Sequence, residues 1–366
     1  TEGVVIIDTS HEEKYQYAAQ NSGIRSVFWV EGKLLWAGTE ENGLAWIKQP
    51  EAGGLNIPEL SVYPIIAGEN EFWIGTGKQG LLRIRDQKVQ LAAGKSDGIN
   101  MVRALYRDSE NRLWIGTRDN GLHIRDGDNI QKISGIQSEN ITAIASYGGR
   151  FWIGARRGLA SVENGNIKTV PALEGLNVHT LYTESPGALL AGTSEGLWKI
   201  DLPGVASRVE SGEAAPDILS VYRDRDGDLW LGTNGSGLAR LREGRLESFS
   251  SSDGIPGNFI YSITVNGNGT IWASCEKGVF RINRDSLIAY ADKRTPALTP
   301  TLYDIRDGMP SSRCNGYCSP SFSFSPEGKL FYPTGAGVAV IKPVEINSPP
   351  PRTVIQGVTS SGERGG

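Results

Sequence analysis

One short motif recurs along the chain at nearly constant spacing, and it restricts the possible folds more than any other feature does. The motif is a tryptophan between two apolar residues, followed by a Gly-Thr step, as in "LWIGT" at 113–117. Successive copies follow at steps of 37 to 42 residues, with a last step of 59. The tryptophan position is held in turn by Trp36, Trp73, Trp114, Trp152, Leu190, Trp230, Trp272 and Phe331. Such a period indicates a fold built from repeated supersecondary units.

Each repeat contains the pattern of four short strands. In the third copy, the apolar segment "MVRALY" leads through the polar turn "RDSENR" to "LWIGT", and a second turn leads to "GLHIR" and a looser strand. Strand signals without helical periodicity predict an all-β array, and four strands in about 40 residues are typical of a propeller blade. We therefore predict an all-β fold, a β-propeller of four-stranded blades. Eight motif copies are visible, so that seven and eight blades are both consistent with the sequence.

The tryptophan and the glycine of the motif have structural explanations. One blade alone cannot bury both faces of its sheet, and a ring that fills the gap to the next blade removes about 200 Å² from water. We expect the six motif tryptophans to be core residues, and the glycine to allow a turn where a Cβ would clash. The long last step predicts an insertion near Pro296 to Pro310. The N-terminal "EGVVIID" is predicted to be either part of an incomplete further blade or a strand that closes the last one.

Composition and charge exclude several classes of protein. The 366 residues carry a net charge of −4 without a block of like charges, whereas a nucleic-acid-binding surface needs a basic stripe. No apolar run reaches the roughly 18 residues of a membrane-spanning helix, and "TEGVVIIDTS" lacks the pattern of a signal peptide. Cys314 and Cys318 in "CNGYC" are equally consistent with a small disulfide and with two unpaired thiols. With Cys275 they offer no metal-binding spacing, and no cofactor is expected.

Three matches to catalytic or binding motifs are attributed to turns. "GTSEG" at 192–196 fits a nucleophile elbow, but a strand rather than a helix is expected after Ser194. "GTGKQG" at 75–80 fits a dinucleotide-binding loop, but "LLRIR" follows where that site needs a helix N-terminus. "DRDGD" at 224–228 begins like a calcium loop, but Gly235 stands at the twelfth position, which needs a bidentate acid. We interpret this last segment as a tight hairpin turn.

The repeats resemble those of a known family. "DGIPGNFIYSITVNGNGTIWASCEKGVFRI" at 253–282 is similar to the two-component regulator propeller repeat, in which Asp-Gly-Leu-Pro-x-Asn precedes an inner strand, Leu-Trp-Ile-Gly-Thr and Gly-Leu. "DGIN" at 97–100 and "DGMPSSRCNG" at 307–316 are further matches, although "IWASC" and "LFYPT" have lost the Gly-Thr step. The segment from "LFYPT" onward resembles the last repeat of such proteins running into an Ig-like β-sandwich. We therefore predict a propeller over 1–343 and, over 344–366, a linker with the truncated start of that sandwich.

This resemblance implies a sensor. Propellers of this family are the extracytoplasmic sensing regions of bacterial transmembrane regulators, either histidine kinases or diguanylate cyclases, and characterised relatives sense glycans or their breakdown products. A periplasmic location and a small-molecule or glycan ligand are therefore expected. The signal would pass to Ig-like and transmembrane domains of the same polypeptide, with or without a homodimer. The kinase or cyclase would lie outside this chain, which is not itself expected to be an enzyme.

Alignment of the repeats reveals one variable position. The innermost strands read "IRSV", "VYPI", "VRAL", "ITAI", "VHTL", "ILSV" and "IYSI", in which the first and fourth residues are aliphatic and the third is small. The second residue varies, and its tyrosine rings could stack on sugars while its arginines could pair with carboxylates or phosphates. The residues predicted to line a ligand site at one mouth of the channel are Arg25, Tyr63, Arg103, His179 and Tyr261. A water-filled channel with an arbitrary polar lining is the alternative.

Two other functions are consistent with the sequence. The first is a carbohydrate lyase or glycosidase on a propeller scaffold. A glycosidase needs two converging carboxylates, whereas Asp108, Asp224 and Asp226 lie in turns that repeat from blade to blade. The second is a protein-interaction platform. Residues that would serve it as surface anchors, or equally as core residues, are Trp29, Trp46 and Trp198.

Overall fold

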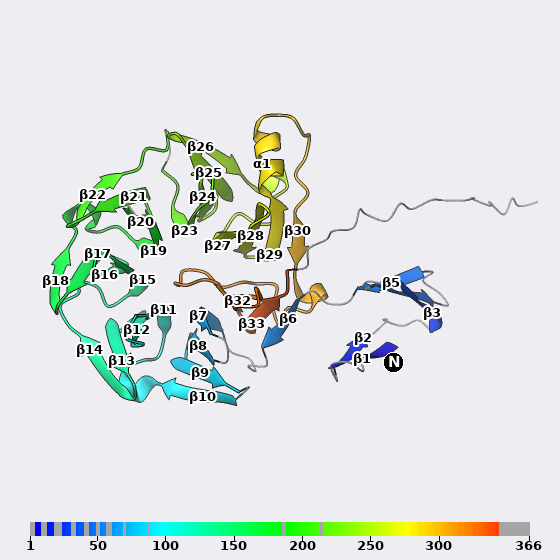
Figure 1. Ribbon diagram of the computed structural model, residues 1–366, viewed down its shortest axis with the longest axis horizontal. Helices are drawn as coiled ribbons and strands as arrows, with labels where there is room; N and C mark the ends of the chain where they lie inside the picture. The colour runs from blue at the N-terminus through cyan, green and yellow to red at the C-terminus, as the bar shows by residue number, and fades with distance from the viewer. Residues whose placement is uncertain are drawn as a thin grey trace, which may run out of the picture.

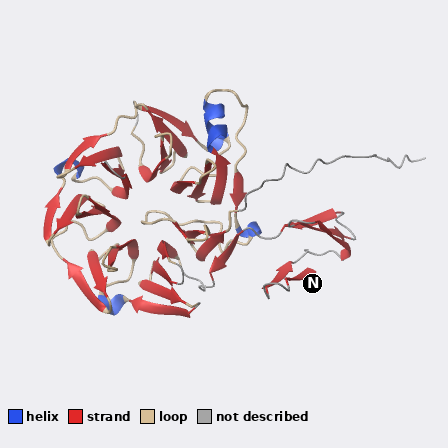
Figure 2. Ribbon diagram, in the orientation of Figure 1, coloured by secondary structure: helices blue, strands red, loops and turns tan. Residues whose placement is uncertain are grey.

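The computed structural model describes residues 61–68, 71–86, 88–184, 188–212 and 215–343, and the backbone of the strands that precede them. Seven four-stranded antiparallel sheets stand around a central axis, each with its first strand innermost (Figure 1). Within the described residues there is one α-helix, α1 (Arg284–Ala291), so that nearly all regular structure is strand (Figure 2). The predicted β-propeller is confirmed, and of the two blade counts that the repeats allowed, seven is found.

The blades follow one another in chain order. Blade 1 consists of β7 (Val62–Ala67), β8 (Glu71–Thr76), β9 (Leu81–Arg85) and β10 (Lys88–Ala93). Blade 2 consists of β11 (Val102–Arg107), β12 (Leu113–Thr117), β13 (Leu122–Asp126) and β14 (Asn129–Ile133). Blade 3 consists of β15 (Ile141–Tyr147), β16 (Arg150–Ala155), β17 (Gly158–Glu163) and β18 (Asn166–Thr169). Blade 4 consists of β19 (Val178–Glu184), β20 (Ala188–Thr193), β21 (Gly196–Asp201) and β22 (Val205–Arg208). Blade 5 consists of β23 (Ile218–Arg223), β24 (Leu229–Thr233), β25 (Leu238–Arg242) and β26 (Arg245–Phe249). Blade 6 consists of β27 (Ile260–Val265), β28 (Thr270–Cys275), β29 (Gly278–Asn283) and β30 (Thr301–Tyr303). Four 3-10 helices lie between blades: η1 (Lys95–Asp97), η2 (Pro171–Leu173), η3 (Ser251–Asp253) and η4 (Ile305–Asp307).

Blade 7 joins the two ends of the ring. Its strands β31 (Ser323–Phe324), β32 (Leu330–Thr334) and β33 (Gly337–Ile341) are completed by β6 (Ala52–Leu55), which pairs with β33. The expectation that "EGVVIID" might supply this closing strand is wrong, because β1 (Val4–Asp8) pairs instead with β2 (Glu13–Tyr17).

The first motif copy explains why eight copies make seven blades. It lies in a separate three-stranded sheet of β3 (Ile24–Val30), β4 (Leu34–Thr39) and β5 (Leu44–Lys48). The strand after this sheet, β6, is the one that closes blade 7. The seven later copies each contribute the second strand of a blade. Residues 344–366 lie outside the described part, so the boundary at 343 and the sandwich stay predictions.

The motif tryptophans fill the gaps between neighbouring blades. Trp152 of blade 3 is fully buried and clusters with Leu189 and Ile200 of blade 4. Trp230 of blade 5 is likewise fully buried and clusters with Ile271 of blade 6. The other described motif tryptophans, Trp73, Trp114 and Trp272, are at most 5% exposed. The prediction that these side chains are core residues is confirmed, whereas the side chain of Trp36 lies outside the described residues.

The glycine of the motif is required by the adjacent blade rather than by a turn. Gly232 lies within β24, and a Cβ there would come within 2.2 Å of Ser220 Oγ and 2.4 Å of Ile260 O. Ser220 belongs to the inner strand of the same blade and Ile260 to that of the next one. The same contact with both inner strands is made by Gly75, Gly116, Gly154 and Gly192. The expectation of a turn at this glycine is wrong, because the glycine marks the closest approach of two blades.

The threonine of the motif clamps the turn that follows it. In blade 5, Thr233 Oγ1 donates to Gly237 O at 2.8 Å and accepts from Ser236 N at 2.9 Å. The same pair of bonds is made by the buried side chains of Thr76, Thr117, Thr193 and Thr334. The Gly-Thr step and the glycine of the following Gly-Leu step are thus two ends of one hydrogen-bonded turn.

Aspartates hold the other two recurrent turns. Asp224 Oδ1 accepts from the backbone N–H groups of Asp226 and Asp228, both at 3.0 Å, while Oδ2 accepts from Trp230 Nε1 at 2.9 Å. The hairpin interpretation of "DRDGD" is therefore confirmed. Asp253 caps η3 by accepting from Ser250 N at 2.9 Å, and the Asp-Gly step of the family pattern forms the connection between two blades.

The extra length of the last repeat lies in two places. The first contains α1, which begins at Arg284 immediately after β29 and therefore precedes the predicted insertion at 296–310. The second is a departure of the chain from the inner strand of blade 7, between Cys314 and Ser323. Among the described helices, none has the length and apolar character needed to cross a membrane.

Replacing Thr233 by valine is expected to lower the free energy of unfolding by about 0.5–1.5 kcal/mol, because Ser236 N–H loses its partner and the Gly237 carbonyl keeps only the bond from Thr233 N. Urea unfolding followed by tryptophan fluorescence measures the change. Thr169→Val, at an exposed position of β18, is the matched control and should change stability little. Equal stability of the two variants would show that the clamp does not stabilise the fold.

Candidate functional site

The variable second position of each inner strand is a β-bulge. In β11, β15, β19, β23 and β27 the pairing with the second strand skips one residue, and that residue is the variable one. The skipped residues are Arg103, Thr142, His179, Leu219 and Tyr261. In β7 the skipped pair is Tyr63 and Pro64. A bulged residue is released from the sheet ladder and its side chain is re-aimed, so the strand pairing does not restrict which residue stands there.

In blade 7 the bulge is enlarged into a loop. Cys314 bridges to Thr334, and β31 pairs with β32, but the chain between them leaves the sheet. We call this segment, residues 315–322, the channel loop. Figure 1 shows it, in orange, reaching from blade 7 into the centre of the ring. The central channel is therefore crossed by residues of the same chain.

Backbone groups freed by the bulges hold the channel loop in place. Ser319 N donates to Arg103 O at 2.9 Å, and Leu105 N donates to Ser319 O at 2.8 Å. On another side of the ring, Ser321 Oγ donates to Tyr261 O at 2.8 Å. Arg103 and Tyr261 are bulge residues, so the same irregularity that aims their side chains also supplies acceptors for the loop.

Asn315 and Gly316 fix the start of the channel loop. Asn315 Nδ2 donates to Val62 O at 2.6 Å and to Thr334 O at 2.9 Å, which ties blade 7 to blade 1. Gly316 lies against the ring of Tyr261 so closely that a Cβ would fall 2.1 Å from Tyr261 Cδ1. The loop can take this course because Gly316 has no side chain, so that the Tyr261 ring packs directly against its backbone.

Tyr317, a residue of the channel loop, is the centre of a hydrogen-bonded network. The Tyr317 hydroxyl donates to Asn234 Oδ1 at 2.7 Å, and Asn234 Nδ2 donates to Asp217 Oδ2, also at 2.7 Å. Asp217 Oδ1 lies 2.9 Å from His179 Nε2. The Tyr317 ring contacts the rings of His179 and Tyr261, with centroids 5.9 Å and 6.2 Å apart. One loop tyrosine therefore touches side chains from blades 4, 5 and 6.

Burial and hydrogen bonding set the ionisation of this network. Burial alone would raise the pKa of Asp217, but hydrogen bonds from His179 and Asn234 hold it below its ordinary value. Burial raises the pKa of Tyr261 to about 12, and it also raises the pKa of Tyr317. At neutral pH the site therefore presents the neutral phenols of Tyr261 and Tyr317 and the carboxylate of Asp217. Tyr317 is 41% exposed.

The predicted site residues meet this arrangement to different degrees. His179 and Tyr261 contact Tyr317 directly, whereas Arg103 lies across the ring with its guanidinium 3.8 Å from the centroid of Tyr63. Arg25 lies on β3, in the sheet that is not one of the seven blades, and its side chain lies outside the described residues. The structure thus brings four of the five predicted residues to the ring.

The channel loop and its partners were not found from the sequence. Asp217, Asn234 and Tyr317 stand outside the strand position that was compared between repeats. The sequence signal for the channel loop alone is the 59-residue last step, because the chain between the Asp-Gly motif at 307–308 and "LFYPT" is longer than in the other repeats.

The thiols and the remaining motif matches have structural places. Cys275, Cys314 and Cys318 are free and buried, so the disulfide alternative for "CNGYC" is not the state of this structure. Burial raises the pKa of Cys275 to about 11 and that of Cys318 to about 12, which makes both unreactive at neutral pH. Ser194 Oγ accepts a hydrogen bond from Asn177 N within a turn. The described residues contain no group of His, Cys, Asp and Glu side chains suited to a metal ion.

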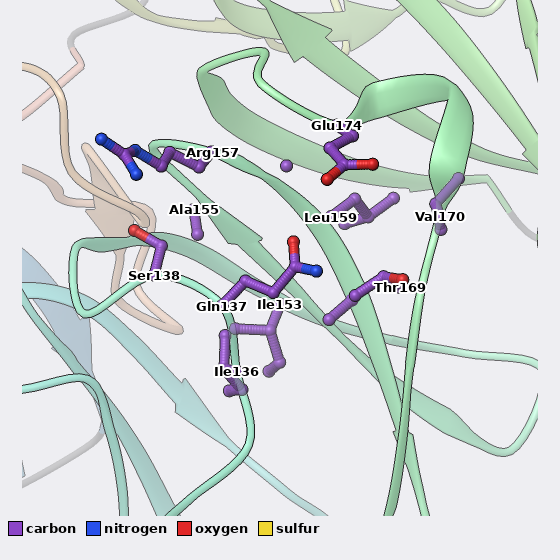
Figure 3. A pocket seen from close by; sticks show the side chains of 12 residues that line it. Ile136, Gln137, Ser138, Ile153, Ala155, Arg157, Leu159, Thr169, Val170 and Glu174 are labelled. Carbon is purple, nitrogen blue, oxygen red and sulfur yellow. The ribbon is translucent and has the colours of Figure 1, made fainter.

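A cavity beside blade 3 is too small to be a ligand site. Figure 3 shows that it lies between aliphatic side chains such as Ile136, Ile153 and Leu159, with Arg157 and Glu174 near its rim. Its volume of about 20 Å³ admits roughly one water molecule.

Comparisons with known proteins agree with the repeats and the ring. The family model of the two component regulator propeller matches residues 97–119 and 212–235, which confirms the resemblance inferred from the motifs. No curated protein is detectably similar in sequence.

Solved structures with low sequence identity share the fold. The extracellular domain of a hybrid two component system from B. thetaiotaomicron superposes with a TM-score of 0.68 at 20% identity, covering 93% of this chain and 48% of that one. Virginiamycin B lyase from Staphylococcus aureus with quinupristin gives 0.62 at 15% identity, covering 80% and 98%. The WD40 propeller domain of Doa1 gives 0.58 at 12% identity, covering 79% and 96%. The chain spans about half the length of the first of these structures.

Gly316→Ala is expected to displace the channel loop, because the new methyl group would overlap the Tyr261 ring. Hydrogen exchange should then accelerate at the amides of Leu105 and Ser319, which bond across the loop, while amides of the outer strands keep their protection. Gly335→Ala in the same blade is the control, since the nearest atom to its Cβ would be 3.8 Å away. Unchanged protection of both amides in Gly316→Ala would contradict this picture of the loop.

The Asp217 carboxylate is expected to make stability depend on acid pH. The pKa of Asp217 is lower in the folded protein than in the unfolded chain, where it is about 3.9. The contribution of Asp217 to the free energy of unfolding is therefore fully present above the unfolded pKa and is lost as the pH falls through the folded pKa. Between about pH 5 and pH 2, Asp217→Asn should therefore lose less stability than the unaltered protein does. Urea unfolding across this range measures it, with the exposed Asp119→Asn as control. Parallel pH profiles for all three proteins would refute the assignment.

Proposed function

Because the chain carries two-component regulator propeller repeats, we propose that it is the ligand-sensing propeller of an extracytoplasmic signalling protein, with a periplasmic location. Its ligand is a small polar molecule, a glycan fragment or another small molecule, bound at the channel mouth. The chain has no chemistry of its own in this proposal. It passes the signal to later parts of the same polypeptide, namely an Ig-like domain and a transmembrane segment leading to a kinase or cyclase.

The observation that carries the proposal is the gathering of bulge side chains around the channel loop. The bulges release these side chains from the strand pairing, although Tyr261 also belongs to the apolar cluster of blades 5 to 7. The Tyr317 hydroxyl bonds to Asn234, while Tyr317 itself stays 41% exposed. An exposed aromatic face among amide, imidazole and carboxylate groups supports binding of a sugar, which stacks on rings and exchanges hydrogen bonds. Arg103 supports an acidic sugar, because guanidinium pairs with carboxylates.

The channel loop offers a route from ligand to output. The loop makes hydrogen bonds to backbone groups of blades 1, 2 and 6, and its Tyr317 side chain contacts blades 4 and 5. A ligand that binds Tyr317 in one loop position better than in another shifts the population of loop positions. Blade 7, from which the loop arises, also holds β33, the last strand of the ring. A shift of the loop therefore acts on the blade from which the chain leaves the propeller.

A catalytic function is the second candidate, and one observation favours it. His179 is 9% exposed, is oriented by Asp217 through Nε2, and lies against the Tyr317 ring, which is a geometry used for proton transfer. The likeness to virginiamycin B lyase adds no argument, because at 15% identity it concerns the fold. Turnover of a bound saccharide would favour this candidate over a sensor.

The platform alternative receives less support from the described surface. Trp198 is half-buried and packs in the cluster of blades 3 and 4, while the side chains of Trp29 and Trp46 lie outside the described residues. Self-association in sedimentation experiments would support a platform or a signalling homodimer. A nucleic-acid partner is not proposed, given the net charge of −4.

We expect isothermal titration with a panel of neutral and uronic-acid-containing oligosaccharides to identify at least one ligand. The double variant Arg103→Ala and Tyr317→Ala should weaken its binding at least about tenfold, which corresponds to about 1.4 kcal/mol. Arg245→Ala, exposed on the outermost strand β26, is the control and should bind normally. No binding across the panel, or equal binding by the double variant, would overturn the channel site. Chromatography of each mixture after incubation tests for turnover.

A further inference from the structure

One register position distinguishes blade 2 from the other six blades. The position lies on the third strand of a blade and pairs with the residue that precedes the motif tryptophan, or its substitute, on the second strand. In six blades this position holds an aliphatic residue that is at most 7% exposed. These residues are Ile84, Val162, Ile200, Leu241, Ile282 and Ile341. In blade 2 the same place, opposite Leu113, is taken by Arg125. A charged side chain thus stands where the fold otherwise places part of its core.

Arg125 is mostly withdrawn from water and incompletely paired. Its side chain is 13% exposed, and within the described residues its buried Nε has no hydrogen-bond partner. Its guanidinium lies 5.1 Å from the centroid of Trp73 in blade 1. The one carboxylate at hydrogen-bond distance is that of Asp128, at 2.8 Å, and that side chain is fully exposed. Burial of an under-paired charge costs stability unless another group compensates it.

Arg125 lines a cavity of about 180 Å³ between blades 1 and 2 that holds two more arginines. Glu71, with its side chain 17% exposed, is a carboxylate of this cavity, and it already accepts from Trp73 Nε1 at 2.9 Å, Arg83 Nε at 2.6 Å and Arg107 at 3.1 Å. Of the three guanidinium groups, those of Arg83 and Arg107 thus share Glu71, whereas that of Arg125 pairs with the exposed Asp128. Arg107 ends β11, at the opposite end of that strand from the bulge, so the cavity opens on the other face of the ring from the channel mouth.

Blade 5 shows how this fold neutralises a buried arginine. Arg240 stands in the register of Arg83, opposite the motif tryptophan, and its side chain is 6% exposed. Its guanidinium bonds to Asp228 at 2.6 Å and lies 3.4 Å from Glu247. Arg240 is thus paired with two carboxylates of its own blade, whereas Arg125 is without a buried one.

We propose that the cavity between blades 1 and 2 is a binding site for an oxyanion group, a carboxylate, sulfate or phosphate. Arg125, Arg83 and Arg107 provide the guanidinium groups that line the cavity, and the Trp73 ring holds the guanidiniums of Arg83 and Arg125 in place. The volume accommodates an oxyanion together with a small part of the molecule that carries it. This site does not depend on the proposed function, since it shares no residue with the channel mouth.

The test uses Arg125→Leu, which restores the aliphatic residue of the other blades. Inorganic phosphate, inorganic sulfate and glucuronate are titrated separately into the whole chain by calorimetry, which distinguishes a free ion from an acidic sugar. At least one should bind in the millimolar range or tighter, and Arg125→Leu should weaken that binding at least about tenfold. Arg118→Leu removes an exposed charge at the end of β12 that faces the channel mouth, and it should bind normally. Without oxyanion, Arg125→Leu should unfold at the same temperature as the unaltered protein or higher.

Two results would overturn the proposal. The first is that none of the three oxyanions binds the unaltered protein. The second is that Arg125→Leu unfolds at a markedly lower temperature without oxyanion, which would make Arg125 a structural partner of Trp73. Arg107→Gln, at a side chain that is 36% exposed, is the second variant if Arg125→Leu fails to fold, and it too should weaken oxyanion binding.

Discussion

The fold depends on how closely the second strand of one blade approaches the inner strand of the next. At Gly232 this approach leaves no room for a Cβ, and the small third residue of the inner strand, Ser220 in blade 5, belongs to the same contact. Tryptophan fills the space farther from the axis, where the wedge between two blades widens. Each interface therefore needs one very small and one very large side chain a short distance apart. This requirement repeats around the ring and explains why the motif repeats along the chain.

The same close packing explains where functional side chains can stand. Most positions of an inner strand are committed to neighbours on both sides, and the bulge residue is the exception because the ladder skips it. His179 and Tyr261 occupy such positions, and the strand pairing leaves their side chains able to face Tyr317. The channel loop extends this principle, since it is a bulge enlarged to eight residues, 315–322. A ring that is rigid between its blades thus has its adaptable part at the axis.

Charges in the interior follow two patterns. In blade 5, Arg240 is enclosed with carboxylates from its own blade, so that the charge is structural. Between blades 1 and 2, Glu71 is shared by two arginines, while a third, Arg125, has a buried Nε without a partner among the described residues. A repeat protein makes such a difference visible, because each blade serves as a control for the others.

The sequence by itself determined the blade, the burial of its tryptophan, the hairpin turn at 224–228 and the variable position on the inner strands. These features follow from contacts within one repeat or between consecutive repeats, so a pattern of about 40 residues contains both partners. Only the tertiary structure decided that seven blades close the ring, since this depends on β6 pairing with β33 from the far end of the chain. It also decided that Arg25 stands apart from the ring, that Tyr317 reaches His179, and that Arg125 faces Trp73. The contact between Tyr317 and His179 joins blades 7 and 4, which are not consecutive, so no local pattern could indicate it. The contact between Arg125 and Trp73 joins consecutive blades, but it depends on how side chains pack between them.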